Sequence, residues 1–186
     1  MRFAPIRHRT TTAQDPSLSR RESRGQSLVE FALVLGPLLL VFLAIVQFGF
    51  IFNAYVTMTN ATREGARTGT VYVYDGTKSK AQNDLARNNA IKTAVLSSMN
   101  LLSKSSPQFA SGTTWTQSGL TYTNGDLTVT YSVPVDLTDS DARVGQSVTV
   151  TATYHQDMII PIIANLLPLD PGRRLGLSGQ VTMVLN

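Results

Sequence analysis

The distribution of apolar residues separates one long continuous run from a larger part with periodic patterns. Residues 31–52 form 22 positions of almost unbroken apolar character, and Gln47 is their single strongly polar side chain. A soluble core helix would present a polar face about every 3.6 residues, whereas this run is apolar all round. As a helix it would measure about 33 Å, which is the thickness of the hydrocarbon core of a bilayer. The run therefore predicts a transmembrane helix.

Helical spacing continues beyond the predicted span, over residues 53–70. Small or apolar residues recur there three or four positions apart, at Ala54, Met58, Ala61 and Gly65. This small-residue stripe would let another helix approach closely, so it is a candidate contact with a partner helix. We favour packing on the chain's own sheet, because this helix must bury its apolar face somewhere. Arg63 and Arg67 lie at i, i+4. They lie on a solvated face or form a local salt bridge with Glu64, or else they contact the same partner.

Beyond residue 75 the pattern predicts a helix followed by strands. Residues 78–102 have the spacing of an amphipathic helix, whose apolar face contains Ala81, Leu85, Ile91, Val95, Met99 and Leu102. From residue 120 the period changes to two, and Asn124-Gly125 is a strong hairpin signal. Alternation recurs over residues 120–122, 127–133, 148–154 and 177–185. We predict an α+β protein: a long N-terminal transmembrane helix, then an antiparallel sheet of about four strands with one or two helices.

Charge is concentrated at the N-terminus. Residues 1–25 contain six arginines and two acids, whereas residues 26–186 contain ten basic and ten acidic side chains. A neutral body excludes the extended basic face of a nucleic-acid-binding protein. The basic flank places the N-terminus in the cytoplasm and the C-terminal part outside it. The predicted organisation is a basic leader (1–25), a transmembrane and extended helix (26–74) and an extracytoplasmic domain (75–186).

A glycine and a carboxylate stand directly before the predicted span. Gly25 ends the basic leader, and Glu30 precedes the first residue of the apolar run. An unpaired carboxylate in hydrocarbon is costly, so Glu30 needs a partner or an interfacial position. Cleavage after Gly25 would provide a partner, the new amino group of Gln26 in the same or a neighbouring subunit. Alternatively, Glu30 lies among the headgroups and stabilises the helix N-terminus.

Few residues are suited to catalysis or metal binding. The chain has no cysteine, and His155 is its one histidine outside the leader. No nucleophile motif accompanies it, so we predict no enzyme and no cofactor. Asp136, Asp139 and Asp141 cluster within six residues, and calcium takes such oxygen ligands. Their spacing departs from that of an EF-hand loop, which favours a solvated loop instead.

A second apolar run, at residues 158–169, is interrupted by Pro161 and Pro168. It is too short to cross a bilayer. It either packs back on the core or presents an apolar surface to the bilayer or to a partner. Both interpretations stay open at this point.

Two motifs give the N-terminal part a resemblance to a known family. Gly25 is followed by VEFAL at residues 29–33, and REGAR follows at residues 63–67. Over residues 24–69 the chain resembles the TadE-like family, which are pseudopilins of the tight-adherence, or Flp, pilus system. The resemblance leaves the TadE or TadF subgroup open.

The resemblance implies a non-enzymatic, single-pass protein of the bacterial inner membrane that supports pilus assembly. A prepilin peptidase would cleave the bond between Gly25 and Gln26. Glu30 would then be the acidic residue at position five of the mature chain. The implied partners are that peptidase, other pseudopilins and pilus assembly proteins. The competing function is an uncleaved, single-pass anchored protein for extracytoplasmic binding or adhesion.

Overall fold

The protein is described by a computed structural model that covers residues 16–105, 109, 114–132, 143–165, 167–170 and 172–186. Side chains are described from residue 25 onward, apart from those of residues 162 and 163. By their internal contacts the residues form two units, Met1–Leu43 and Ala44–Asn186.

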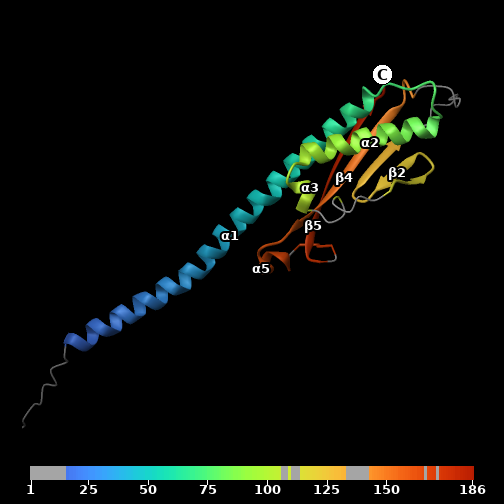
Figure 1. The fold of residues 1–186 in the computed structure, drawn as a ribbon. Coiled ribbons are helices and arrows are strands. Elements are labelled where there is room, and N and C mark those ends of the chain that lie inside the picture. The colour runs from blue at the N-terminus through green and yellow to red at the C-terminus, as the bar shows by residue number, and fades with distance from the viewer. Residues whose placement is uncertain (1–15, 106–108, 110–113, 133–142, 166, 171) are drawn as a thin grey trace, which may run out of the picture. The chain divides into compact units, whose positions relative to one another are not determined.

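The described part of the first unit is a segment of one long helix, α1 (Pro16–Thr70), which continues into the second unit (Figure 1). An apolar window in its Gly25–Thr70 part has the length and composition to cross a membrane, and none of that window is buried. Large apolar side chains such as Phe31 and Phe42 are exposed. A continuous apolar surface of this size is unfavourable in water, so α1 indicates single-pass membrane anchoring.

The second unit is an antiparallel sheet with helices. Its strands are β1 (Thr116–Ser118), β2 (Thr121–Asn124), β3 (Leu127–Tyr131), β4 (Ser147–Asp157) and β5 (Arg174–Val184), and its helices after α1 are α2 (Lys80–Met99), α3 (Leu102–Ser105) and α5 (Pro161–Ala164). Neighbours in sequence pair in the order β1-β2-β3-β4-β5. The α+β class and the antiparallel sheet predicted from the sequence are confirmed.

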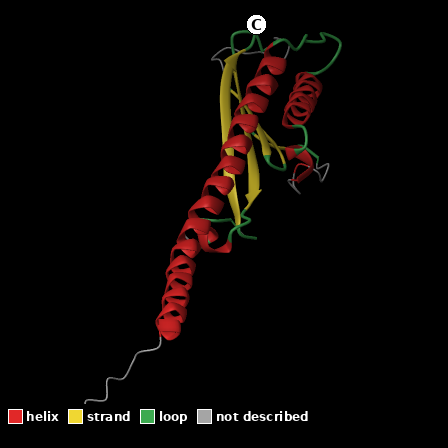
Figure 2. Ribbon diagram, turned by 90° about the vertical axis from the view of Figure 1, so that its left-hand side faces the viewer, coloured by secondary structure: helices red, strands yellow, loops and turns green. Residues whose placement is uncertain are grey.

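One face of the sheet is buried beneath α1 and α2. In β4 the residues Val148, Val150 and Ala152 are buried, and Val129 in β3 pairs with Val150 on the same face. Figure 2 shows the strands running alongside the C-terminal part of α1. The opposite face is rich in threonine, at positions 121, 123, 128, 130, 149, 151 and 153. Threonine is β-branched and polar, so it suits a strand face in contact with water.

Glycines allow α1 to approach its neighbours closely. A β-carbon at Gly65 would clash with Cγ2 of Val95 on α2. On β5, a β-carbon at Gly179 would lie 3.1 Å from Oγ1 of Thr62 and 3.3 Å from Cγ of Met58. The helix therefore contacts both α2 and the sheet where one side lacks a side chain.

The sheet differs from the prediction in two details. It has five strands rather than about four, because β1 consists of three exposed residues that show no apolar alternation. The predicted hairpin exists, but Asn124 pairs with Leu127, so its loop is Gly125 and Asp126. Gly125 has a φ of 59° at the first loop position, which glycine adopts readily.

Helix α2 lies where the sequence predicted a helix, and Ile91, Val95 and Met99 of its predicted apolar face are buried. Ala81 and Leu85, predicted to face the core, are exposed. The buried residues are Asn83, Asp84, Arg87, Asn88, Ile91, Val95 and Met99. The first half of the helix thus buries polar side chains. Asp84 and Asn88 accept hydrogen bonds from Tyr122 and Tyr131 of the sheet, and Asn83 bonds the segment before α2.

The substitution Gly65→Ala tests the close approach of α1 and α2. We expect the free energy of unfolding to fall by about 1–3 kcal/mol, because the new methyl group overpacks the contact with Val95. Gly49→Ala is the matched control, since a β-carbon there meets nothing within 4 Å. Thermal unfolding of the full chain in detergent, followed by near-UV circular dichroism, measures both variants. Equal midpoints for the two would contradict the packing.

Candidate functional site

The predicted processing segment lies on α1 ahead of the apolar run. Gly25, Gln26 and Glu30 are exposed, and a β-carbon at Gly25 would meet nothing within 4 Å. Nε2 of Gln26 donates a hydrogen bond to Oε1 of Glu30 over 2.9 Å. The two residues stand one helical turn apart, so a charge created at position 26 would lie beside the carboxylate.

The small-residue stripe of α1 is covered by α2 and the sheet of the same chain. Ala54, Met58, Ala61 and Gly65 are all buried. Met58 lies against Gly179 of β5, and Gly65 lies against α2. The sequence favoured packing on the protein's own sheet. The contact of Met58 agrees with that interpretation, whereas Gly65 packs on α2.

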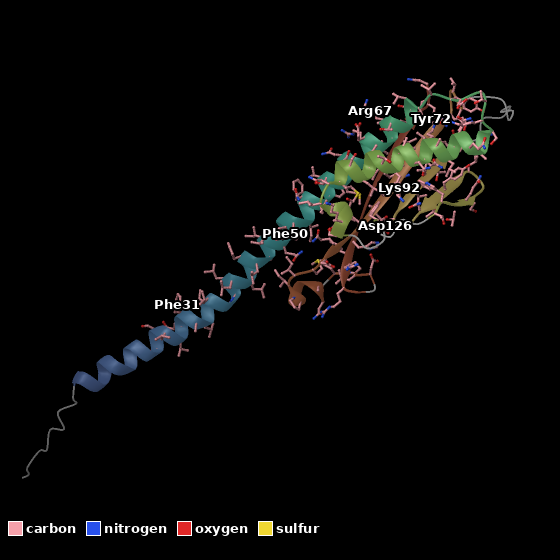
Figure 3. All side chains as sticks on the ribbon, viewed as in Figure 1. Phe31, Phe50, Arg67, Tyr72, Lys92 and Asp126 are labelled. Atoms are coloured by element: carbon pink, nitrogen blue, oxygen red, sulfur yellow. The ribbon has the colours of Figure 1, made fainter. Side chains whose placement is uncertain are left out.

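Arg63 and Arg67, on another face of α1 than the stripe, are exposed. Nη2 and Nε of Arg67 donate to the two carboxylate oxygens of Glu64, over 2.6 and 3.0 Å (Figure 3). These hydrogen bonds lower the pKa of Glu64 and raise that of Arg67. An exposed pair of this kind adds little stability. Arg63 is exposed on the same helix, so both arginines are accessible to a partner.

A buried ion pair joins α2 to the segment before β4. Nε and Nη2 of Arg143 donate to the two carboxylate oxygens of Asp84, over 2.5 and 2.6 Å. The Tyr122 hydroxyl donates to the same carboxylate over 3.0 Å, and Gln146 accepts from Nη1 of Arg143 over 2.8 Å. Burial, with the Asp84 charge, raises the pKa of Tyr122 to about 12. Burial alone would lower the pKa of Arg143, but hydrogen bonding to Asp84 raises it above its usual value.

A second buried arginine, Arg87, stands beside this pair. Its Nη1 lies 3.8 Å from Asp84, and its guanidinium carbon lies 4.9 Å from the ring centroid of Tyr72 and 5.9 Å from that of Tyr131. Within the described part of the chain, its Nε and Nη1 have no hydrogen-bond partner. The aromatic faces therefore supply much of its stabilisation. Arg87 and Arg143 line a cavity of about 350 Å³.

This polar cluster was not predicted from the sequence, although the helical periodicity of α2 contains a signal for it. Ile91 and Val95 mark the buried face of α2. Counting back from Ile91 along that face by three, four and seven residues reaches Asn88, Arg87 and Asp84. Charged residues aligned with an apolar stripe indicate buried partners, but their identity depends on contacts distant in sequence.

His155 on β4 bridges two carboxylates. Its Nδ1 lies 3.0 Å from Asp170, and its Nε2 lies 3.2 Å from Asp126, which Figure 3 labels. The two ring nitrogens point in different directions, so this arrangement connects β4 to the β2–β3 hairpin and to the segment before β5. Among the described residues, no group of three His, Asp or Glu side chains is arranged to hold a metal ion. The candidate calcium ligands Asp136, Asp139 and Asp141 lie outside the described residues.

The substitution Asp84→Asn tests the buried ion pair. It leaves two buried guanidiniums without their counter-charge, so we expect a loss of about 3–5 kcal/mol in the free energy of unfolding. Glu64→Gln makes the same change in an exposed pair and should alter it by less than about 1 kcal/mol. Urea unfolding of the full chain in detergent compares them. Similar losses in both variants would show that burial of the Asp84 pair is unimportant.

Similarity to known proteins is found in the N-terminal part of the chain. A family model described as TadE-like protein matches residues 25–67. No curated protein and no solved structure matches the chain. The matched segment contains Gly25, Glu30, the apolar run and the REGAR motif. The resemblance is confirmed for this segment: residues 25–67 match the TadE-like family model.

Proposed function

We propose that this protein is a non-enzymatic, single-pass pseudopilin that supports assembly of a tight-adherence pilus. One observation supports this most directly: Gly25 and Glu30 stand immediately before the apolar run, inside the TadE-like segment. The protein resides in the bacterial inner membrane, with its basic N-terminus in the cytoplasm and its sheet domain outside.

In this proposal a prepilin peptidase cleaves between Gly25 and Gln26. Both residues are exposed on α1, so side-chain packing does not protect the bond. Glycine is less favourable in a helix than alanine by about 1 kcal/mol, which eases local unwinding at the bond. The basic leader stays on the cytoplasmic side, where cleavage takes place.

Glu30 then pairs with an amino terminus created by the cleavage. Before cleavage, the carboxylate accepts a hydrogen bond from the side chain of Gln26. After cleavage, position 26 carries a positive charge, which either the same Glu30 or that of a neighbouring subunit neutralises. Lateral association moves these groups into a medium of low dielectric constant, where an unpaired charge is costly. The pairing therefore favours association in register.

Partner subunits contact a part of α1 other than the buried stripe. Ala54, Met58, Ala61 and Gly65 serve the chain's own fold, whereas Arg63 and Arg67 are exposed. Tyr55 and Val56 are exposed on the same helix. These exposed residues offer both apolar area and charge for contact with other pilus proteins.

The alternative is an anchored binding or adhesion protein that keeps its leader. The hydrogen bond between Gln26 and Glu30 supports it, because it gives the carboxylate a partner without cleavage. The terminal residue of the mature protein separates the two functions.

The substitution Gly25→Leu tests the cleavage site. We expect the leader to be retained, because a large side chain occupies the position before the cleaved bond. Mass spectrometry of the N-terminal peptide from native membranes would then show a chain that starts before Gln26. Gly36→Leu makes the same change in the same helix, in equally open surroundings, and should leave the terminus at Gln26. Normal processing of the Gly25 variant would contradict the assignment.

The substitution Glu30→Gln tests the role of the carboxylate. We expect unchanged membrane insertion, because removing a charge makes insertion easier. The number of surface pili should decrease about tenfold or more. A loss of about 1.4 kcal/mol in the free energy of association between subunits has this effect. Asp75→Asn, which removes a carboxylate from the turn after α1, is the control. Membrane fractionation and pilus counts measure the two effects, and loss of the protein from the membrane would argue against this role.

A further inference from the structure

The loop between β4 and β5 contains an apolar segment that lies between charged residues. Residues 158–169 contain no charged side chain and include the short helix α5. At one end Asp157 accepts a hydrogen bond from Nε of Arg174 over 2.7 Å. At the other end Asp170 lies 3.0 Å from Nδ1 of His155. The change from hydrogen-bonded polar side chains to apolar residues is therefore sharp on both sides.

This loop is hydrogen-bonded to Gln47, the polar residue of the apolar run. The backbone N–H of Ile159 donates to Oε1 of Gln47 over 3.0 Å, and Nε2 of Gln47 lies 3.7 Å from Sδ of Met158. Gln47 is only 1 % exposed as a result. A polar amide without a partner is costly in hydrocarbon, and so is an unpaired backbone N–H. The two groups satisfy each other.

The position of Gln47 in the apolar run sets the depth of the loop. Gln47 lies five residues before Phe52, the last residue of the run. At about 1.5 Å per residue, it is about 7–8 Å inside the end of the run. Segments that lie on a membrane bury their apolar face by about 5–10 Å. A loop that binds Gln47 therefore reaches the boundary between headgroups and acyl chains.

We propose that this apolar segment, described at residues 158–165 and 167–169, inserts into the leaflet nearest the sheet domain, with lipid acyl chains as its ligand. The side chain of Ile159 is 66 % exposed although its backbone is tied to Gln47. It extends the apolar surface that α1 presents at this depth. The proposal rests on membrane anchoring by α1 and is independent of leader cleavage and of any role in a pilus.

The backbone of the loop suits a medium that lacks water. Pro161 and Pro168 have no N–H to satisfy. The N–H groups of Ala164 and Asn165 donate to carbonyls one turn earlier, over 3.1 and 3.3 Å. The side-chain oxygen of Asn165 accepts from Nη2 of Arg173 over 2.7 Å. Arg173 is exposed and provides a positive charge at the level of the lipid phosphates.

Single-cysteine variants test this proposal, because the natural chain contains no cysteine. Ile159→Cys and Val144→Cys replace apolar residues of similar exposure, 66 % and 62 %. Val144 precedes β4, whereas Ile159 follows it, so the two labels lie at opposite ends of that strand. Each full-length variant is labelled with an NBD fluorophore in vesicles of phosphatidylethanolamine and phosphatidylglycerol. We expect the label at 159 to show blue-shifted emission, quenching by acyl spin-labelled lipid and protection from iodide, and the label at 144 to show none of these.

A third variant, Phe42→Cys, reports on the anchoring helix itself. If spin-labelled lipid quenches the label at 42 while the label at 159 behaves like that at 144, the insertion of the loop is refuted and anchoring stands. A blue shift at 159 without lipid quenching would show that protein, such as a second copy, covers the loop, and would also refute the proposal. If the label at 42 is not quenched either, the proposal fails together with anchoring.

Discussion

The close packing of α1 on its own domain is the constraint on which the rest of the structure depends. The same helix exposes apolar residues all round in its N-terminal part and buries a stripe from Ala54 to Gly65 against α2 and the sheet. The change of surroundings takes place between Gln47 and Ala54. A lipid-facing helix tolerates any apolar residue, whereas packing requires small residues at fixed positions.

Polar interactions determine which face of α2 packs on the sheet. An apolar face with Ala81 and Leu85 was available, yet the helix buries Asp84 and Arg87. A buried ion pair adds little net stability compared with apolar packing, but an unpaired charge in its place is strongly destabilising. The pair with Arg143 therefore discriminates against alternative orientations of the helix, because any rotation would leave charges buried without partners.

Local patterns in the sequence predicted much of this fold. The apolar run, the helix after residue 78 and the alternation of the longer strands follow from periodicity alone. β1 was missed because three polar residues have no period. In α2 the prediction was right for Ile91, Val95 and Met99 but missed the buried Asp84, because its partner Arg143 lies 59 residues away. In the candidate site, Gly25 and Glu30 were identified by a short motif. The contact between Gln47 and Ile159 spans 112 residues, and no local pattern encodes it.

Two attachments to one membrane have a consequence for assembly. A domain connected to a bilayer by a single helix is free to tilt relative to the bilayer. An apolar loop inserted beside that helix restricts this tilt and sets the height of the domain above the membrane. Arg63 and Arg67 would then meet partners at one height and tilt. Association costs less entropy when the orientation is set in advance. The bond between Gln47 and the loop would thus favour lateral assembly even though it contacts no partner.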